Sequence, residues 1–340
     1  MKIGLVFGAL IGLSVGTYLV LDYGLSEVSG ALLAAGWCGF AAVTIAHLAV
    51  IALCGLAWHV LAVGTAPLRD YMAFFWARFL RDGVNNLIGI VPCAGEVAGA
   101  RELRWRGVPA GVAGAATVID VSTELLSQLL FTFMGLAVLI AEQPGADRTW
   151  WAGGGLAVAT ILIVGFVHAQ KNGLFRFLES LPARLGLLQH WDNEAASVHA
   201  AIQEIYSQHI RVVASIAMHL VAWFARCLEA LIALHFMGSS LPIVDVIALE
   251  ALVYALRTVA FIVPSAVGVQ EGGYVVIGAL FGLGPEIALA LSLIKRAREV
   301  ALGIPALIAW QILETRRLWN GMGSRADANG GRVRDPGALH

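Results

Sequence analysis

The stretch Ile262-Val263-Pro264-Ser265-Ala266-Val267-Gly268-Val269-Gln270-Glu271 interrupts an apolar segment of the chain. A similar stretch, Ile90-Val91-Pro92-Cys93-Ala94-Gly95-Glu96, interrupts an earlier one. Proline and glycine break helices, and inside a bilayer the freed backbone groups must find partners in the protein. A carboxylate at membrane depth is costly and marks a site or a pathway. Two such breaks at corresponding places in two halves are typical of a transporter core.

The composition around these breaks is that of a helical membrane protein. Hydrophobic residues make up 59% of the 340 residues and charged residues only 13%, whereas soluble domains carry about 25% charged residues. The mean hydropathy is +0.79. The net charge of -1 shows no basic field of the kind that attracts nucleic acid. We therefore predict an all-α polytopic membrane protein and no nucleic-acid partner.

The apolar runs predict about six transmembrane helices, because each is long enough to cross the bilayer core. The predicted spans are 3–21, 38–63, 108–141, 149–168, 211–237 and 285–313. The first is expected to be retained, because it shows neither a basic leading segment nor a clear cleavage site. Two further apolar stretches, 72–95 and 245–283, contain the breaks and are predicted to be re-entrant pairs of half-helices.

Basic residues between the spans predict the orientation, since they gather on the cytoplasmic side. Arg69, Arg78 and Arg81 follow the second span, and bases also border the central loop and the last span. The loop at 238–244 carries none. This pattern predicts that both termini are cytoplasmic.

The same charge pattern predicts that the two breaks enter from opposite sides, so that units 38–141 and 211–314 form an inverted repeat within a single transmembrane domain, 1–320. The offset between Pro92 and Pro264 is 172 residues. Applied throughout, this offset pairs Arg257 with Asn85 and Lys295 with Thr123. Inverted repeats place a shared binding site near the midplane.

The remaining segments are not predicted to span. Apolar and basic residues at helical spacing predict an amphipathic cytoplasmic segment over 169–210, ending in a polar helix at about 194–208. The tail, 321–340, is rich in glycine and polar residues and is predicted to be disordered.

The glutamates of the two breaks, Glu96 and Glu271, are the leading candidates for substrate binding. They could face a polar cavity and bind a head group, an ion or a proton. They could also cap the half-helices, because a carboxylate at a helix N-terminus is stabilised by free N–H groups and by the helix dipole. Pro92, Gly95, Pro264 and Gly268 are the predicted structural breaks.

A second set of candidates consists of charged residues inside apolar helices. Its members are Lys295, Arg296, Arg298, Arg257, Asp120 and Glu124. They could form a basic pocket for a phosphate or another anionic head group, with the acids tuning it. Alternatively, they could form an ion-pair network that only neutralises charge. Arg226, Glu229 and Glu250 could belong to the same lining.

No catalytic signature is visible, and neither a cofactor nor a metal site is predicted. HExxH, GxSxG and Walker patterns are missing. The cysteines are scattered and are typical of small apolar fillers: Cys38, Cys54, Cys93 and Cys227. The histidines that stand alone in the predicted spans are typical of hydrogen-bonded packing residues: His47, His59, His219 and His235.

At these residues the chain resembles the flippase-like transmembrane superfamily of the lysylphosphatidylglycerol synthases. Pro264, Gly268 and Glu271 stand at the P-x3-G-x2-E spacing of that superfamily, and Arg296 stands where its members tend to carry a base. Pro92, Gly95 and Glu96 match the first break. Many members carry an arginine close to that glutamate, whereas here Arg101 is the nearest base that follows it.

Within the superfamily, 261–284 and 288–303 most resemble hopanoid-biosynthesis-associated membrane proteins of the HpnL type. The resemblance implies lipid handling in a bacterial cytoplasmic (inner) membrane. We expect a lipid transporter or flippase-like protein, not an enzyme, whose partner is a membrane lipid with an anionic head group or a hopanoid. Lipid-biosynthesis proteins are further expected partners. The alternatives are a non-catalytic subunit of a lipid-biosynthesis complex and a membrane-embedded lipid-modifying enzyme.

Overall fold

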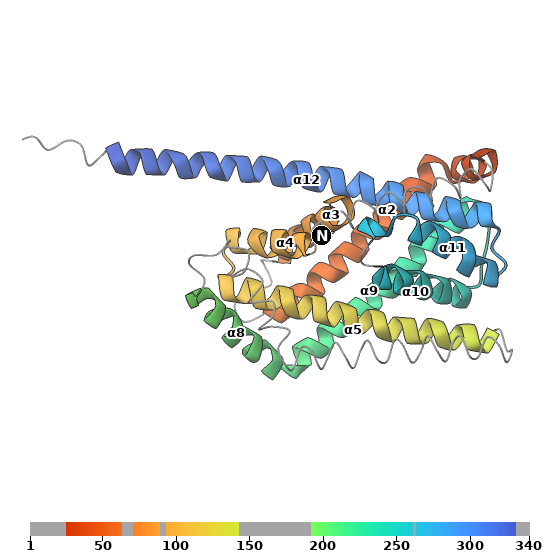
Figure 1. Ribbon diagram of the computed structural model, residues 1–340, viewed down its shortest axis with the longest axis horizontal. Coiled ribbons are helices and arrows are strands. Elements are labelled where there is room, and N and C mark those ends of the chain that lie inside the picture. Colours follow the sequence, from red (N-terminus) through yellow and green to blue (C-terminus); the bar gives the residue numbers. More distant parts are fainter. Residues whose placement is uncertain (1–24, 63–70, 89–92, 143–191, 261–262, 331–340) are drawn as a thin grey trace, which may run out of the picture.

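The computed structural model describes residues 25–62, 71–88, 93–142, 192–260 and 263–330. Within these ranges the chain forms helices and no strand (Figure 1). The elements in chain order are α2 (Leu25–Ala62), α3 (Tyr71–Ile88), α4 (Ala94–Trp105), α5 (Ala110–Glu142), α8 (Asp192–Ser207), α9 (His209–Phe236), α10 (Ile243–Val259), the 3-10 turn η2 (Pro264–Ala266), α11 (Val269–Leu280) and α12 (Pro285–Gly330).

Three helices of the described chain are long and apolar enough to cross a membrane. They are Leu32–Ala62 in α2, Ala110–Ala141 in α5, and α9, His209–Phe236. They coincide with the spans predicted at 38–63, 108–141 and 211–237. The chain is therefore an all-α polytopic membrane protein.

The structure does not establish the other three predicted spans as membrane-crossing helices. Residues 3–21 and 149–168 lie outside the described residues. The span at 285–313 lies within α12, which carries four charged residues from Lys295 to Glu299. Three of the four are buried against neighbouring helices, which is how charge is tolerated at membrane depth. The total of six spans stays a prediction.

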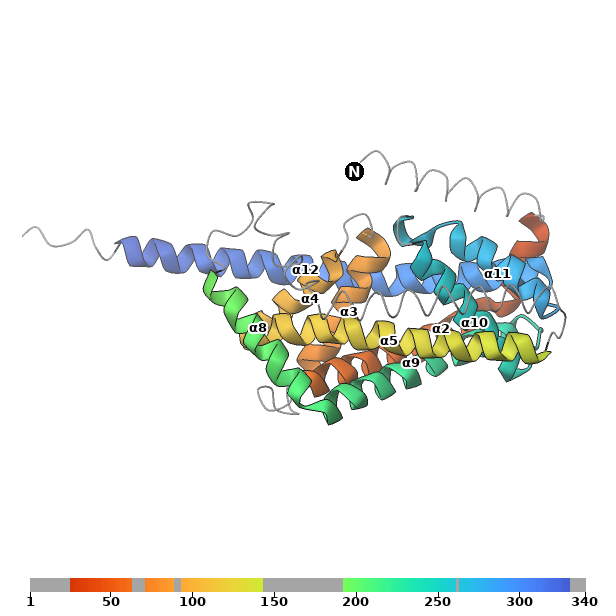
Figure 2. The ribbon, with the colours of Figure 1, turned by 60° about the horizontal axis from the view of Figure 1, so that its bottom comes forward.

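The helices pack as two similar units. The first is α2–α3–α4–α5 and the second is α9–α10–α11–α12. α2 packs along α9, α5 packs against α10 as α12 packs against α3, and α5 packs against α9 as α12 packs against α2. Figures 1 and 2 show α3 and α4 toward one end of the bundle and α10 and α11 toward the other. This pairing is what a twofold relation between the units gives.

The leading helices of the two units, α2 and α9, run in opposite directions. Gly39 lies against Phe236, His47 hydrogen-bonds Glu229, and Cys54 packs with Ala222. Residue numbers thus rise along α2 as they fall along α9. Opposite directions are what inverted units require, and their inversion in a membrane stays a prediction.

The register between the units changes at the break. α3 and α10 begin at Tyr71 and Ile243, 172 residues apart. α5 and α12 begin at Ala110 and Pro285, 175 residues apart. The reason is that the second break has three more residues between its proline and its glutamate. The pairing of Arg257 with Asn85 agrees with this register, but Lys295 corresponds to Asp120 and not to Thr123.

The half-helices differ in place from the predicted re-entrant pairs. The first break separates α3 from α4, and α4 runs beyond the predicted stretch 72–95. The predicted stretch ended before most of α4 because this helix carries charged residues, including Arg101 and Arg104. The second break separates α10 from α11, within the predicted stretch 245–283. Whether either pair re-enters the membrane stays a prediction.

Two cytoplasmic segments were also predicted. α8 forms at Asp192–Ser207, close to the helix predicted at 194–208, and packs against α5 and α9. The rest of the predicted amphipathic segment, 169–191, lies outside the described residues. α12 continues to Gly330 and extends past the other helices in Figure 1, whereas disorder was predicted from Gly321.

Close helix contacts at glycine predict a stability effect. A Cβ on Gly135 of α5 would lie 2.5 Å from the Ala251 Cβ of α10. We expect Gly135→Ala to lower the free energy of unfolding by about 1–3 kcal/mol, because overpacking forces the helices apart. Thermal unfolding in detergent measures this. Gly30→Ala is the matched control, since nothing lies within 4 Å of that position; equal effects of the two changes would contradict the prediction.

Candidate functional site

A short helix begins after each break, close to a polar side chain. Cys93, directly before α4, has a positive φ of 62°. The Gly95 N–H donates to Asn85 Oδ1 at 3.1 Å. A Cβ on Gly95 would lie 2.3 Å from that oxygen, so only glycine allows the approach. Pro92 lies outside the described residues, while Pro264 begins η2. The predicted role of Gly95 in the break thus has a steric basis.

Glu96 lies between α4 and α3. Its Oε1 accepts hydrogen bonds from Arg81 Nε at 3.2 Å and from Asn85 Nδ2 at 3.1 Å. Its side chain is 21% exposed. The carboxylate is therefore held by two groups and still faces open space.

Glu271 is placed differently from Glu96, although both are the third residue of their helix. Its Oε2 accepts a hydrogen bond from the Gly268 N–H at 2.7 Å, which caps the start of α11. Its Oε1 accepts one from Arg296 Nε at 3.1 Å. Arg296 also donates to the carbonyl oxygens of Ser265 and Ala266, at 2.7 and 3.0 Å. Glu271 and Arg296 thus fix the second break.

A first ion-pair cluster joins α3 to α5. Arg78 forms a two-pronged pair with Glu124, at 2.6 and 2.8 Å. Arg81 donates to Asp120 at 2.6 Å and to Glu124 at 3.0 Å. Asp120 also faces His219 Nε2 of α9 at 3.0 Å. Planar guanidinium groups suit such two-pronged contacts with carboxylates.

A second cluster occupies the corresponding place in the other unit, with the charges exchanged. Lys295 of α12 donates to Glu250 of α10 at 2.5 Å and to Tyr274 at 2.9 Å. By the register above, Lys295 corresponds to Asp120 and Glu250 to Arg78. Both groups are almost completely buried. A buried pair of this kind holds two helices together only while both partners are present.

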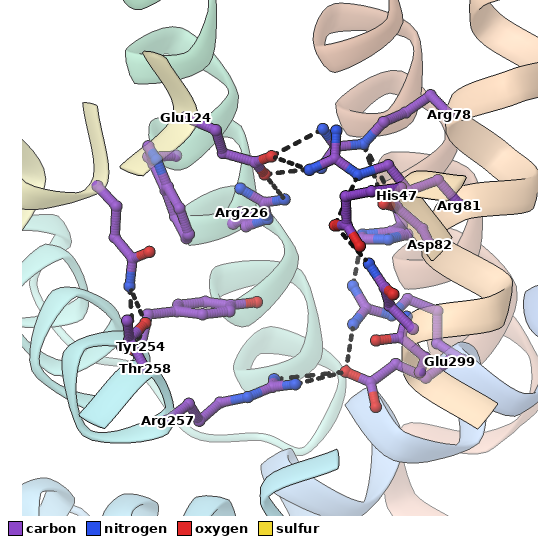
Figure 3. A pocket seen from close by; sticks show the side chains of 16 residues that line it. His47, Arg78, Arg81, Asp82, Glu124, Arg226, Tyr254, Arg257, Thr258 and Glu299 are labelled. Carbon is purple, nitrogen blue, oxygen red and sulfur yellow. Dashed lines mark hydrogen bonds and ion pairs between the residues drawn. The ribbon is translucent and has the colours of Figure 1, made fainter. Parts of the chain in front are cut away.

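A cavity of about 500 Å³ opens between the two units. Helices of both units line it (Figure 3). The lining residues are His47, Arg78, Arg81, Asp82, Asn85, Asn86, Glu96, Glu124, Gln128, Trp223, Arg226, Tyr254, Arg257, Thr258, Arg298 and Glu299. A volume of this size is typical of a small-molecule site, but the density of charge is not.

Arg226 is the lining arginine with the most unused donors. Its guanidinium lies over the Trp223 ring at 4.2 Å and 5.7 Å from the Tyr254 ring. Glu124 is its ion-pair partner, at 3.9 Å, which is beyond hydrogen-bonding distance. Among the described residues no hydrogen-bond acceptor is in reach of it. Stacking therefore holds Arg226 in place while its N–H groups stay available to the cavity.

The lower wall of the cavity in Figure 3 pairs Arg257 with Glu299. The Nη1 and Nη2 atoms of Arg257 each lie 3.4 Å from Glu299 Oε1, which is long for a hydrogen bond. Tyr254 lies between Arg257 and Arg226 in the figure, and its hydroxyl makes no hydrogen bond to a described residue. Two arginines and a hydroxyl thus surround one part of the cavity, an arrangement suited to an anion.

The family profile described as "Lysylphosphatidylglycerol synthase TM region" matches residues 3–306. The chain belongs to this family. A comparison with curated proteins and with solved structures gives no significant match. Membership in the family indicates a function related to membrane lipids, and the cavity lies within the matched region.

In this member of the lysylphosphatidylglycerol synthase TM family, the predicted residues fall into two groups. Those that line the cavity are Glu96, Glu124, Arg257 and Arg298. Those that do not are Asp120, Glu271, Lys295 and Arg296, each held in contacts beside it. Arg298 combines both positions, because it lines the cavity and pairs with Glu229 and His47.

Some lining residues of this family member were missed by the sequence analysis. Arg78 and Arg81 were counted as loop charges, but both are buried in α3. They lie four and seven residues after Phe74, on the same face of α3, and this spacing was the available signal. Arg101 is exposed and stacks on Trp105. The base beside Glu96 is Arg81, which precedes it in the chain.

Proposed function

We propose that the protein transports a membrane lipid, and that the cavity between the two units receives its polar head group. The observation that supports this most is the cavity itself, because its charged lining comes from both units of a membrane-embedded bundle. A head group needs such a polar space to leave the interface, while its acyl chains stay in the bilayer. Movement of one unit against the other would then expose the site to either leaflet.

The lining favours a lipid with an anionic head group. Arg226, Tyr254 and Arg257 offer donors that the described residues leave unused or weakly used. Hydrogen bonds from guanidinium to phosphate are strong and directional. A hopanoid link rests on the resemblance of 261–284 and 288–303 alone. We place the protein in a bacterial cytoplasmic membrane on the same basis.

Reconstitution of the protein alone into liposomes tests the proposal. Fluorescent phosphatidylglycerol, phosphatidylethanolamine and a neutral glycolipid would be compared by quenching the outer leaflet. We expect the anionic lipid to cross fastest, and above the rate in protein-free liposomes. Rates equal to those of protein-free liposomes for all three lipids would contradict transport by the protein alone and favour a subunit role. A new lipid product detected by mass spectrometry would favour the alternative of a membrane-embedded lipid-modifying enzyme.

The two break glutamates are expected to behave differently in that assay. Glu96→Gln weakens the ion pair that holds Arg81 at the cavity wall, so transport should fall while the folded amount stays normal. Glu271→Gln weakens the cap of α11 and the Arg296 pair, so it should lower the free energy of unfolding by about 1–2 kcal/mol. Thermal unfolding and transport, measured on both variants, separate the two roles. Similar stability losses in both variants would show that Glu96 is structural as well.

A further inference from the structure

Three potential metal ligands from three helices meet beside the cavity. They are Cys54 of α2, Glu124 of α5 and His219 of α9. The Cys54 Sγ, a ring nitrogen of His219 and a carboxylate oxygen of Glu124 all lie within 4.8 Å of one another. Cys54 and His219 are buried, and Glu124 also lines the cavity. Only the packing of α2, α5 and α9 brings these distant residues together.

One ring nitrogen of His219 is held by a carboxylate, an arrangement also found in metal-bound histidines. Its Nε2 faces Asp120 Oδ1 at 3.0 Å. Its Nδ1 is buried and has no hydrogen-bond partner among the described residues, although the side chain is only 1% exposed. A carboxylate on the far nitrogen fixes the tautomer and the ring direction of metal-bound histidines. We assign Nδ1 to the ion, because Nε2 is occupied by Asp120.

We propose that Cys54, His219 and Glu124 bind a divalent cation of the zinc type, with Asp120 as the positioning residue for His219. Thiolate, imidazole and carboxylate together form a donor set that zinc accepts. Ligand atoms about 2.0–2.3 Å from the ion lie about 3.5 Å from one another, so the side chains close by about 1 Å. Three protein ligands leave a fourth position, and of the three only Glu124 also lines the cavity.

The arginines around Glu124 are the main opposing feature, because they repel a cation. Arg78 and Arg81 hydrogen-bond to the carboxylate, and Arg226 lies 3.9 Å from its Oε1. Arg78 and Arg81 make three hydrogen bonds to this carboxylate, which has about four lone-pair sites, so one site on Oε1 stays open. The carboxylates of Glu124 and Asp120 offset the charges of Arg78 and Arg81, whereas the charge of Arg226 remains to oppose the ion. Binding as a thiolate also displaces the proton of Cys54, which offsets part of the charge of the ion.

Cobalt titration of the full-length protein in detergent, after treatment with a chelator, tests the site. We expect one equivalent of Co²⁺ to give a thiolate-to-cobalt charge-transfer band, and Zn²⁺ to displace it. Cys54→Ala should remove the band and lower the zinc affinity by more than about 100-fold, because loss of an outer-shell partner alone costs 10–100-fold. Cys227→Ala is the matched control, since Cys227 is also buried and lies outside the cluster.

Asp120→Asn separates a positioning role from ligation. It should weaken zinc binding by about 10–100-fold and keep the charge-transfer band. The proposal is overturned if the wild-type protein shows no band, or if the band survives in Cys54→Ala. If Cys54→Ala does not fold, His219→Gln must lose the band instead. Lipid transport enters none of these readouts, so the outcome leaves the proposed function unaffected.

Discussion

Replacement of Arg226 by glutamine is expected to lower the apparent affinity of the protein for an anionic lipid by about 10–100-fold. The residue offers charge-assisted hydrogen bonds, worth about 1.5–3 kcal/mol, and a tenfold change in affinity corresponds to 1.4 kcal/mol. Its stacking on Trp223 holds the guanidinium toward the cavity without using its N–H groups. The measurement is the concentration dependence of transport in liposomes that contain the anionic lipid.

Two further variants sharpen this experiment. Arg226→Lys keeps the charge but loses the planar fork and much of the stacking, so an intermediate affinity is expected. Arg106→Gln is the matched control, because Arg106 lies outside the cavity, where it pairs with Glu102. An Arg226→Gln protein as active as the Arg106→Gln protein would exclude Arg226 from head-group binding.

The second large effect is expected at the buried pair of α10 and α12. Lys295→Met and Glu250→Gln should each lower the free energy of unfolding by about 3–5 kcal/mol, because each leaves an unpaired polar or charged group in a buried place. Lys295 and Glu250 are 1% and 0% exposed in their side chains. The double variant removes both charges and should recover most of the loss. Denaturant unfolding of the four proteins in detergent gives the coupling between the two positions.

The outcome separates two roles for Lys295. If the residue grips a head group, the double variant stays inactive although it folds. If it only joins α12 to α10, the double variant regains transport together with stability. The contacts to Glu250 and Tyr274 favour the second role. Additive losses of stability in the double variant would show that the two groups do not act as a pair.

Long apolar helices were the most predictable part of the fold. α2, α5 and α9 are each long and apolar enough to cross a membrane. A crossing helix needs about 20 apolar residues in a row, and such a run can be recognised from the sequence alone. α4 was missed as an element of the core because it is short and carries several charged residues, so it does not stand out as an apolar segment. Its place follows from contacts with α3, which a single sequence does not display.

The sequence predicted several residues of the charged site, but not which residues they contact. Glu96, Glu124, Arg257 and Arg298 were recognised because charge inside an apolar segment is costly and needs a reason. Their partners depend on the register between helices, and a shift of three residues at the break moved Lys295 from Thr123 to Asp120. Arg78 and Arg81 were misread because a charged residue near the end of an apolar run looks the same whether it faces water or another helix.

The exchange of charge between the Arg78–Asp120 side and the Glu250–Lys295 side bears on the history of the chain. If the two units descend from one duplicated segment, they began with the same residues at these places. A pair cannot change sign one residue at a time without passing through two like charges or a neutral residue. Two buried like charges cost more than one neutral residue, so we expect some relatives to carry an uncharged residue at one of the four positions.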